Sequence, residues 1–168
     1  MKLYTTRLII ELLSEIDDID FIFQLLNTGG WIRFIGNRNI HGLEEAKHYI
    51  EKIISNPDIS YFTVRTKKDG NAIGLITIIK RSYLDAPDIG FAFLPDYQGK
   101  GFAYEAVTAV LRELISTDNT LEEICAVTMP ENQASISLLK KLGLTYKKTV
   151  KPEDITLDVY AASTQNFK

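Results

Sequence analysis

The sequence lacks several features that would mark special classes of protein. Among its 168 residues there is one cysteine, Cys125, so an internal disulfide is excluded and a reducing, cytoplasmic setting is expected. No run of about 18 apolar residues is present, which excludes a membrane-spanning helix, and no basic start followed by a long apolar run indicates a leader peptide. The two histidines, His41 and His48, stand in no metal-ligand spacing with cysteine or acidic residues, so we expect no metal site.

Internal repeats, low-complexity tracts and linkers rich in glycine, serine or proline are also missing. What is present is an ordinary globular composition, with 45% hydrophobic and 24% charged residues in a chain long enough for one core. We therefore expect one domain over residues 1–168. The net charge of −3 argues against a nucleic-acid-binding surface and favours cationic or neutral partners over acidic ones.

The spacing of apolar residues predicts a mixture of strands and helices. Strands are expected over residues 3–13, 60–66, 72–80, 89–94, 123–128, 145–150 and 155–160, and helices over residues 43–54, 101–117 and 133–142. A further helix is expected to start from a capping-box-like pair at Ser14 and Asp17 and to carry Ile19, Ile22, Phe23 and Leu26. The strands between residues 60 and 94 should form an antiparallel meander. The helix between strands 89–94 and 123–128 predicts a parallel pair, because parallel neighbours need such a crossover.

The stretch from residue 88 to residue 114 carries the clearest chemical signal. A buried strand is followed by Gln98, Gly99, Lys100 and Gly101 and then by an amphipathic helix. The first N–H groups of a helix have no partner within it and lie at the positive end of its dipole. Glycines lack the Cβ that would keep a bulky anion away, so a diphosphate could rest on these N–H groups beside Lys100. The alternative is a tight turn whose glycines serve only positive φ angles.

Two well-known phosphate motifs do not fit this turn. A dinucleotide-binding loop needs a third glycine where Tyr104 stands. A P-loop needs serine or threonine after its lysine, and Lys100 is followed by Gly101.

Three segments resemble one known family. Gln98, Gly101 and Ala103 fit the pattern Gln/Arg-x-x-Gly-x-Gly/Ala, which resembles the acetyl-CoA pyrophosphate loop of the GNAT superfamily of N-acetyltransferases. Residues 132–144 are similar to the asparagine-containing helix of that family, with Leu144 in place of the usual aromatic residue. Residues 6–10 resemble the opening of the ribosomal-protein N-terminal acetyltransferase (RimJ/RimL-like) branch.

The resemblance implies both a fold and an activity. The fold would be α/β (α+β), with a mostly antiparallel sheet of about six or seven strands, about four helices and a splayed pair of parallel strands. The activity would be acetyl transfer from acetyl-CoA to a primary amine on a small molecule or a protein N-terminus, by a monomer or homodimer without a metal. The residues implied in binding coenzyme A are Phe91, Ala92, Phe93, Gln98, Gly99, Lys100, Gly101, Phe102, Ala103 and Asn132.

Acetyl transfer needs a neutral amine, a polarised carbonyl and a proton for the departing thiolate. Asp88 is the candidate base and, being shorter than the usual glutamate, would act through a water; alternatively it only begins a strand and faces solvent. Ser135 is the candidate proton donor, or else an inert serine on an exposed helix face. Many family members place a tyrosine acid where Leu139 stands here. Asn132 can bind the pantetheine amides, cap the helix, or do both.

Residues 27–42 form an expected loop rich in aromatic and basic groups. Trp31 and Phe34 could wall an acceptor pocket while Arg33 or Arg38 pairs with an anion; alternatively the aromatic residues are hydrophobic plugs and the arginines are solvated. In the family this region shapes the acceptor site.

Two other functions compete with acetyl transfer. One is a non-catalytic module that senses or recruits acyl-CoA, because the base is short and the usual acid is absent. The other is a nucleotide-binding domain that uses the same turn.

Overall fold

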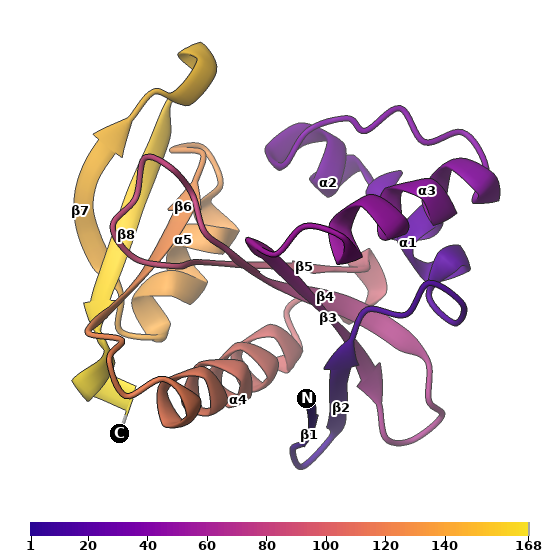
Figure 1. Cartoon of the computed structure of the whole chain (residues 1–168), viewed down its shortest axis with the longest axis horizontal. Helices are drawn as coiled ribbons and strands as arrows, with labels where there is room; N and C mark the ends of the chain where they lie inside the picture. The colour runs from indigo at the N-terminus through magenta and orange to yellow at the C-terminus, as the bar shows by residue number, and fades with distance from the viewer. Residues whose placement is uncertain (168) are drawn as a thin grey trace.

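A computed structural model describes residues 1–167 and shows one twisted sheet of eight strands (Figure 1). In spatial order the strands are β1 (Lys2–Tyr4), β2 (Leu8–Leu12), β3 (Ile59–Thr66), β4 (Ala72–Ile79), β5 (Asp88–Phe93), β6 (Glu123–Thr128), β8 (Leu157–Ser163) and β7 (Thr145–Val150). All neighbours are antiparallel except β5 and β6, which are parallel as the sequence predicts.

Five α-helices cover the two faces of this sheet. They are α1 (Ile19–Leu26), α2 (Gly29–Phe34), α3 (Leu43–Ile54), α4 (Phe102–Thr117) and α5 (Gln133–Lys141), and the short 3-10 turns are Pro95–Tyr97, Pro152–Asp154 and Thr164–Phe167. Helices α1 to α3 pack into one hydrophobic cluster with Leu75 of β4, whereas α4 and α5 pack into another with Ile76 of the same strand. Because neighbouring residues of a strand face opposite sides, the two clusters lie on the two faces of the sheet (Figure 1).

The predicted fold class is confirmed, and two details of the prediction are wrong. The sheet has eight strands rather than six or seven, because residues 3–13 turn back at Thr5 and form the hairpin of β1 and β2. The predicted closing hairpin is present as β7 and β8, and β8 lies between β6 and β7. The expected loop of residues 27–42 begins with the short helix α2, whose first turn is capped by the Thr28 hydroxyl accepting from the Trp31 N–H at 3.3 Å.

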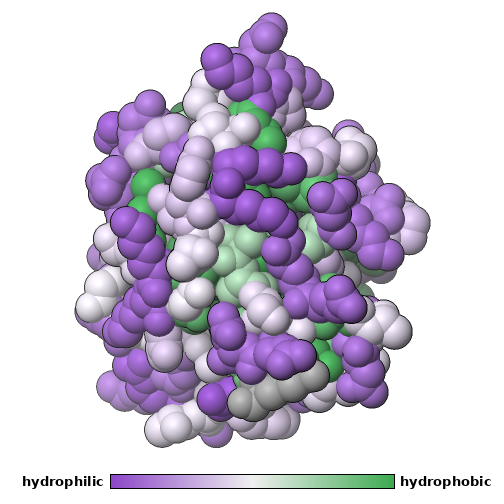
Figure 2. All heavy atoms as spheres, turned by 90° about the vertical axis from the view of Figure 1, so that its left-hand side faces the viewer, coloured by the Kyte–Doolittle hydropathy of each residue, from purple (hydrophilic) through white to green (hydrophobic). Residues whose placement is uncertain are grey.

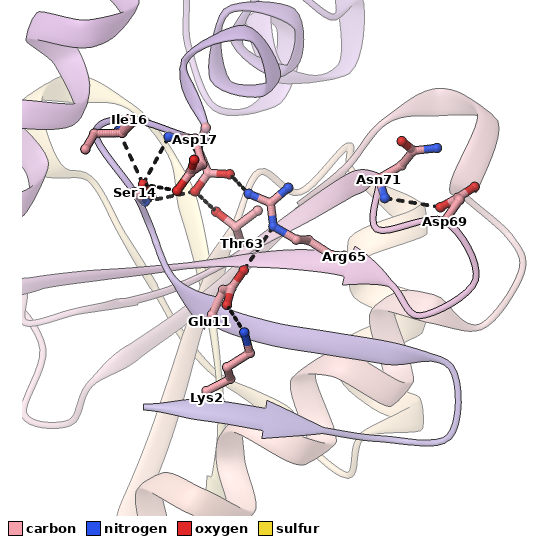
Figure 3. Close-up of polar contacts among 10 residues, drawn as sticks. Lys2, Glu11, Ser14, Ile16, Asp17, Thr63, Arg65, Asp69 and Asn71 are labelled. Carbon is pink, nitrogen blue, oxygen red and sulfur yellow. Dashed lines mark hydrogen bonds and ion pairs between the residues drawn. The ribbon is translucent and has the colours of Figure 1, made fainter.

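A buried carboxylate fastens the segment before α1 to the sheet (Figure 3). Asp18 is fully buried, and its Oδ2 accepts from the Ser14 N–H and the Thr63 hydroxyl, both at 2.8 Å. Its other oxygen pairs with Arg65, whose Nε donates to Glu11 at 3.1 Å. The buried charge is therefore paired and hydrogen-bonded, which a carboxylate in this position requires.

The surface around β7 and β8 is mainly hydrophilic (Figure 2). The first five residues of β7 are exposed, among them Lys147 and Lys148. Charged side chains on an edge strand hinder its pairing with another chain. No helix within residues 1–167 has the length and the apolar character that crossing a membrane requires.

Candidate active site

Strands β5 and β6 share a single pair of facing residues, Asp88 and Cys125. The Cys125 N–H donates to the carbonyl of Pro87 at 2.9 Å, just before β5 begins. From Gly90 to Phe93, β5 pairs with β4 on one side and with no strand on the other, within the part of the chain that the structure describes. The two strands thus form a fork, defined here as residues 88–93 of β5 and 125–128 of β6, which is closed at Asp88.

The Asp88 side chain sits where the fork closes. Its Oδ1 accepts from the Val127 N–H at 3.0 Å, in the place where a backbone carbonyl of β5 would serve a regular parallel ladder. Its Oδ2 accepts from Arg81 Nε at 2.6 Å. Asp88 is only 2% exposed, so the alternative that it faces solvent is wrong.

The surroundings of Asp88 favour a carboxylate that can exchange a proton. Burial raises the pKa of Asp88, although the Arg81 charge and the Val127 N–H both favour its ionised form. Each carboxylate oxygen can accept more than one hydrogen bond, so both retain acceptor capacity. A carboxylate with a raised pKa is a better match for proton transfer near neutral pH than an ordinary aspartate.

A row of small and polar side chains lies on the same face of the sheet as Asp88. Tyr61, Thr77 and Gly90 are paired across β3, β4 and β5, so their side chains share a face. A Cβ on Gly90 would lie 2.5 Å from the Thr77 hydroxyl, so only glycine fits there. The Tyr61 hydroxyl lies 3.2 Å from that of Tyr49, and burial raises the pKa of Tyr61, which therefore stays protonated at neutral pH.

The glycine turn has the positive φ angles that the alternative of a tight turn requires, and this geometry is also compatible with an anion site. Gly99 and Gly101 have φ angles of +70° and +80°, which residues with a Cβ rarely adopt. Gly101 is the N-cap of the 16-residue helix α4 and offers no side chain to the first N–H groups of that helix. Residues 98–101 are exposed, whereas Phe102 and Ala103 at the start of α4 are half-buried. The Gln98 side chain donates to the carbonyl of Phe93 at 2.8 Å and ties the turn to the end of β5.

Helix α5 follows β6 in the chain, and four residues separate the two elements. Asn132 is its N-cap, and Asn132 Oδ1 accepts from the Ser135 N–H at 3.2 Å, so the capping role is present. The amide nitrogen of Asn132 remains a donor. Ser135 is half-buried rather than fully exposed, and Leu139 is 1% exposed in the core, where it contributes only packing.

The three candidate acceptor residues are not brought together. Trp31 is 4% exposed and packs with α1 and α3, so the alternative of a hydrophobic plug describes it. Arg33 is exposed and lies over the ring of Phe34, its guanidinium carbon 4.8 Å from the ring centroid. Arg38 is also exposed, and its Nη1 is directed to the carbonyl of Gly36 at 3.4 Å.

A cavity of about 630 Å³ opens beside the end of β5, lined among others by Asp17, Asp20, Asp96 and Tyr97. Three carboxylates would repel a diphosphate, so this cavity does not suit the coenzyme. Within residues 1–167, no three side chains of His, Cys, Asp or Glu gather in a way that could hold a metal ion.

Sequence reasoning missed the structural roles of two arginines. Arg81 is the partner of Asp88, but an arginine seven residues before an aspartate forms no recognised motif. Arg7 belongs to the opening segment noted from the resemblance, and the structure places its guanidinium against the glycine turn, 93 residues later in the chain, where it donates to the carbonyl of Lys100 at 3.0 Å.

Comparison with known proteins identifies the family. The model of the acetyltransferase (GNAT) domain matches residues 7–145. The chain belongs to the GNAT acetyltransferase family. It is thereby an acyltransferase, as predicted, and acetyl-CoA is the donor characteristic of the family.

Individual GNAT proteins agree with this assignment. An uncharacterised N-acetyltransferase, YnaD of Bacillus subtilis, is 29% identical over 144 residues, which cover 86% of this chain and 82% of that protein. The structure of RimL, a ribosomal alpha-N-protein acetyltransferase in complex with coenzyme A, has a TM-score of 0.83 at 14% identity and covers 97% of this chain and 98% of that one. Spermidine N-acetyltransferase from Vibrio cholerae, in complex with CoA and spermine, has a TM-score of 0.80 at 20% identity, covering 97% and 99%. The GNAT fold is confirmed by these likenesses.

Proposed function

We propose that this GNAT protein transfers the acetyl group of acetyl-CoA to a primary amine by direct attack in a ternary complex. The observation that carries the proposal is the fork between β5 and β6 beside the glycine turn at the start of α4. The N–H groups of residues 99–103 would hold the diphosphate, with Lys100 adding a charge. The pantetheine arm would run along Phe91, Ala92 and Phe93, toward Asp88, and meet Asn132 on the other side.

The chemistry follows from the groups at the closed end of the fork. The amine nitrogen would attack the thioester carbonyl carbon, the carbon–sulfur bond would break, and coenzyme A would leave as a thiolate. Asp88 would take the proton of the amine through a water, because its oxygens already bind Arg81 and Val127. Ser135 or a water would return a proton to the sulfur, since Leu139 cannot.

An amine of modest size, either a small molecule or a protein N-terminus, is the acceptor that we propose. Two of the similar structures support both kinds, since their names state a polyamine and a ribosomal protein. The net charge of −3 favours a cationic or neutral acceptor. Arg33 and Arg38 are the exposed cations of the expected rim, and they would contact an anionic part of the acceptor if it has one.

The first test is calorimetric titration with coenzyme A. The wild-type protein should bind it, and Gly101→Val should weaken binding by about tenfold or more, because a β-branched residue is strained at a φ of +80° and its side chain would obstruct the anion. Gly30→Ala is the matched control, since a Cβ at Gly30 would meet nothing within 4 Å. Absence of CoA binding in the wild type would overturn the proposal.

The second test separates an enzyme from a sensor. The protein is incubated with acetyl-CoA and a panel of amines comprising a polyamine, an aminoglycoside, amino acids and short peptides, and thiol release is measured. Turnover on any amine supports the proposal. Tight CoA binding without turnover on the whole panel would favour the sensor, for which the hydrogen bonds that Asp88 already accepts from Arg81 and Val127 are the supporting observation. Competition of ATP with CoA would favour the nucleotide-binding domain.

A further inference from the structure

Arg7 lies in the turn between β1 and β2, yet its side chain reaches the start of α4. Its Nε donates to Glu105 Oε2 at 2.7 Å, and its Nη1 donates to the carbonyl of Lys100 at 3.0 Å. Its guanidinium carbon lies 4.3 Å from the centroid of the Phe102 ring. Its Nη2 lies 3.4 Å from the position that a Cβ on Gly101 would take. One guanidinium therefore contacts the glycine turn and the first turn of the helix at four positions.

Hydrogen bonds also fix Glu105 and the turn that carries Arg7. Glu105 Oε1 accepts from the Thr5 hydroxyl at 2.6 Å and from the Arg7 N–H at 2.9 Å. The turn that carries Arg7 is held in place because the Leu8 N–H donates to the Thr5 hydroxyl at 3.0 Å and the Lys67 N–H donates to the Arg7 carbonyl at 2.8 Å. The guanidinium thus projects from a rigid support, and its planar fork of donors fits a carboxylate and a carbonyl together.

Charge gives this arrangement a second effect. Glu105 is the acidic residue in the first turn of α4, the end of the helix that would face the diphosphate. A negative charge there suits an empty helix, but it repels a bound anion. Burial would raise the pKa of Glu105, but the hydrogen bonds from Thr5 and Arg7 and the Arg7 charge hold it below its usual value, so Glu105 is ionised at neutral pH. The paired guanidinium of Arg7 compensates that charge.

We propose that Arg7 is a positioning residue for the donor: it fixes the backbone of residues 100–102 so that the N–H groups face the diphosphate, and it neutralises Glu105 beside that anion. This rests on the proposed function, because it assumes that the diphosphate of coenzyme A occupies the glycine turn. The contacts that carry it are those of Arg7 with Lys100, Phe102 and Glu105.

Binding measurements on variants test the proposal without knowledge of the acceptor. Calorimetry with coenzyme A should show a Kd raised by about tenfold in Arg7→Ala, the size expected from losing charge-assisted hydrogen bonds. Arg7→Lys keeps the charge but not the fork, and should fall between Arg7→Ala and the wild type. Glu105→Gln should bind CoA at least as tightly as the wild type. Added to Arg7→Ala, it should recover part of the loss.

A truncated ligand distinguishes loop positioning from general damage. Pantetheine lacks the diphosphate, and its Kd can be measured by competition with CoA. This Kd should be the same in Arg7→Ala as in the wild type. Lys147→Ala is the matched control, because the Lys147 side chain is as exposed as that of Arg7 and also forms an ion pair, with Glu123. This variant should leave the CoA Kd unchanged. Thermal unfolding checks that each variant is folded.

The outcomes are separable from those of the proposed function. If the wild type does not bind CoA, the proposed function fails. If the wild type binds and Arg7→Ala binds within about twofold of it, the positioning role fails. If pantetheine and CoA weaken equally in both Arg7→Ala and Arg7→Lys, Arg7 supports the fold rather than the diphosphate site, and the proposal is likewise overturned.

Discussion

The Asp88 carboxylate is held between a guanidinium and a backbone N–H group, and both contacts bear on what a substitution would do. An asparagine can keep the hydrogen bond from Val127, because its amide oxygen is an acceptor of nearly the same shape. It cannot accept a proton from an amine. The observed role of this residue, holding the fork, and its proposed role, accepting a proton, are therefore separable by a single substitution.

We predict that Asp88→Asn lowers kcat by about 100-fold while the Kd for coenzyme A changes little. A base must be unprotonated, so the wild-type rate should fall as the pH falls through the raised pKa of Asp88, and the variant should lose this acid limb. Steady-state kinetics over a pH series measures both effects. Asp85→Asn, on an exposed neighbour, is the control. An unaltered pH profile with nearly full kcat would restrict Asp88 to holding the fork.

Trp31, a candidate for the acceptor pocket, packs in the hydrophobic core. The indole is buried among α1 and α3, and its Nε1 has no hydrogen-bond partner within residues 1–167. We predict that Trp31→Ala lowers the free energy of unfolding by about 3–5 kcal/mol, because it opens a large cavity. Trp31→Phe should cost less, since it keeps an aromatic ring, leaves a smaller cavity and removes the unpaired donor.

Urea unfolding of the Trp31 variants measures these losses. Arg33→Ala is the control, because an exposed arginine should change stability by no more than about 0.5 kcal/mol. If Trp31 instead walled an acceptor pocket, Trp31→Phe would raise the acceptor KM at unchanged stability, which contradicts the prediction.

At the scale of elements, the first hairpin and α4 are joined through Glu105. The pKa of Glu105 is lower in the folded protein than its ordinary value of 4.5, so the folded state favours the ionised form. Its contribution to stability is therefore complete above the unfolded pKa and is lost as the pH falls through the folded pKa. The partly exposed ion pair limits this contribution to about 1 kcal/mol.

We predict that Glu105→Gln is less stable than the wild type at pH 7 and that the difference shrinks at about pH 3.5. Urea midpoints at the two pH values measure it, with Glu131→Gln, an exposed acid before α5, as the control. A difference that grows on acidification would contradict the linkage. The same variant is expected to bind CoA at least as tightly as the wild type, so stability and donor affinity should change in opposite directions.

At the scale of the whole molecule, β6 lies deep in the sheet, between β5 and β8. Cys125, on this strand, is 2% exposed, and burial, with the nearby Glu123 charge, raises the pKa of its thiol to about 11. A thiol reacts through its thiolate, so the folded protein should be nearly inert to thiol reagents.

We predict that Cys125 reacts with a chromogenic disulfide reagent only when the whole molecule unfolds, because no smaller opening exposes a central strand. The labelling rate across a urea series should follow global unfolding measured by circular dichroism. Rapid labelling in native buffer would show that β6 opens locally. A low rate also means little background in the thiol-release assay for acetyl transfer.

Local patterns determined the fold class and the donor loop. The parallel pair of β5 and β6 follows from one helical crossover, and the turn at Gly99 and Gly101 follows from residues that are neighbours in the chain. Patterns of this kind are readable because short-range sterics, glycine torsions and hydrophobic periodicity act over a few residues. The eighth strand and α2 were not predicted, because a chain reversal at Thr5 and a helix of six residues leave little hydrophobic periodicity in the sequence.

The tertiary structure alone decided which distant residues meet. Nothing near Asp88 in the sequence indicates that it would bind both Arg81 and the N–H of Val127, 39 residues later. The contact of Arg7 with Glu105 spans 98 residues, and the burial of Trp31 depends on two neighbouring helices. These contacts come from how the sheet is ordered and from how its faces are covered, and that order is a property of the whole chain. The sequence by itself therefore determined where a diphosphate could bind. Only the folded sheet decided which side chains contact and support that glycine turn.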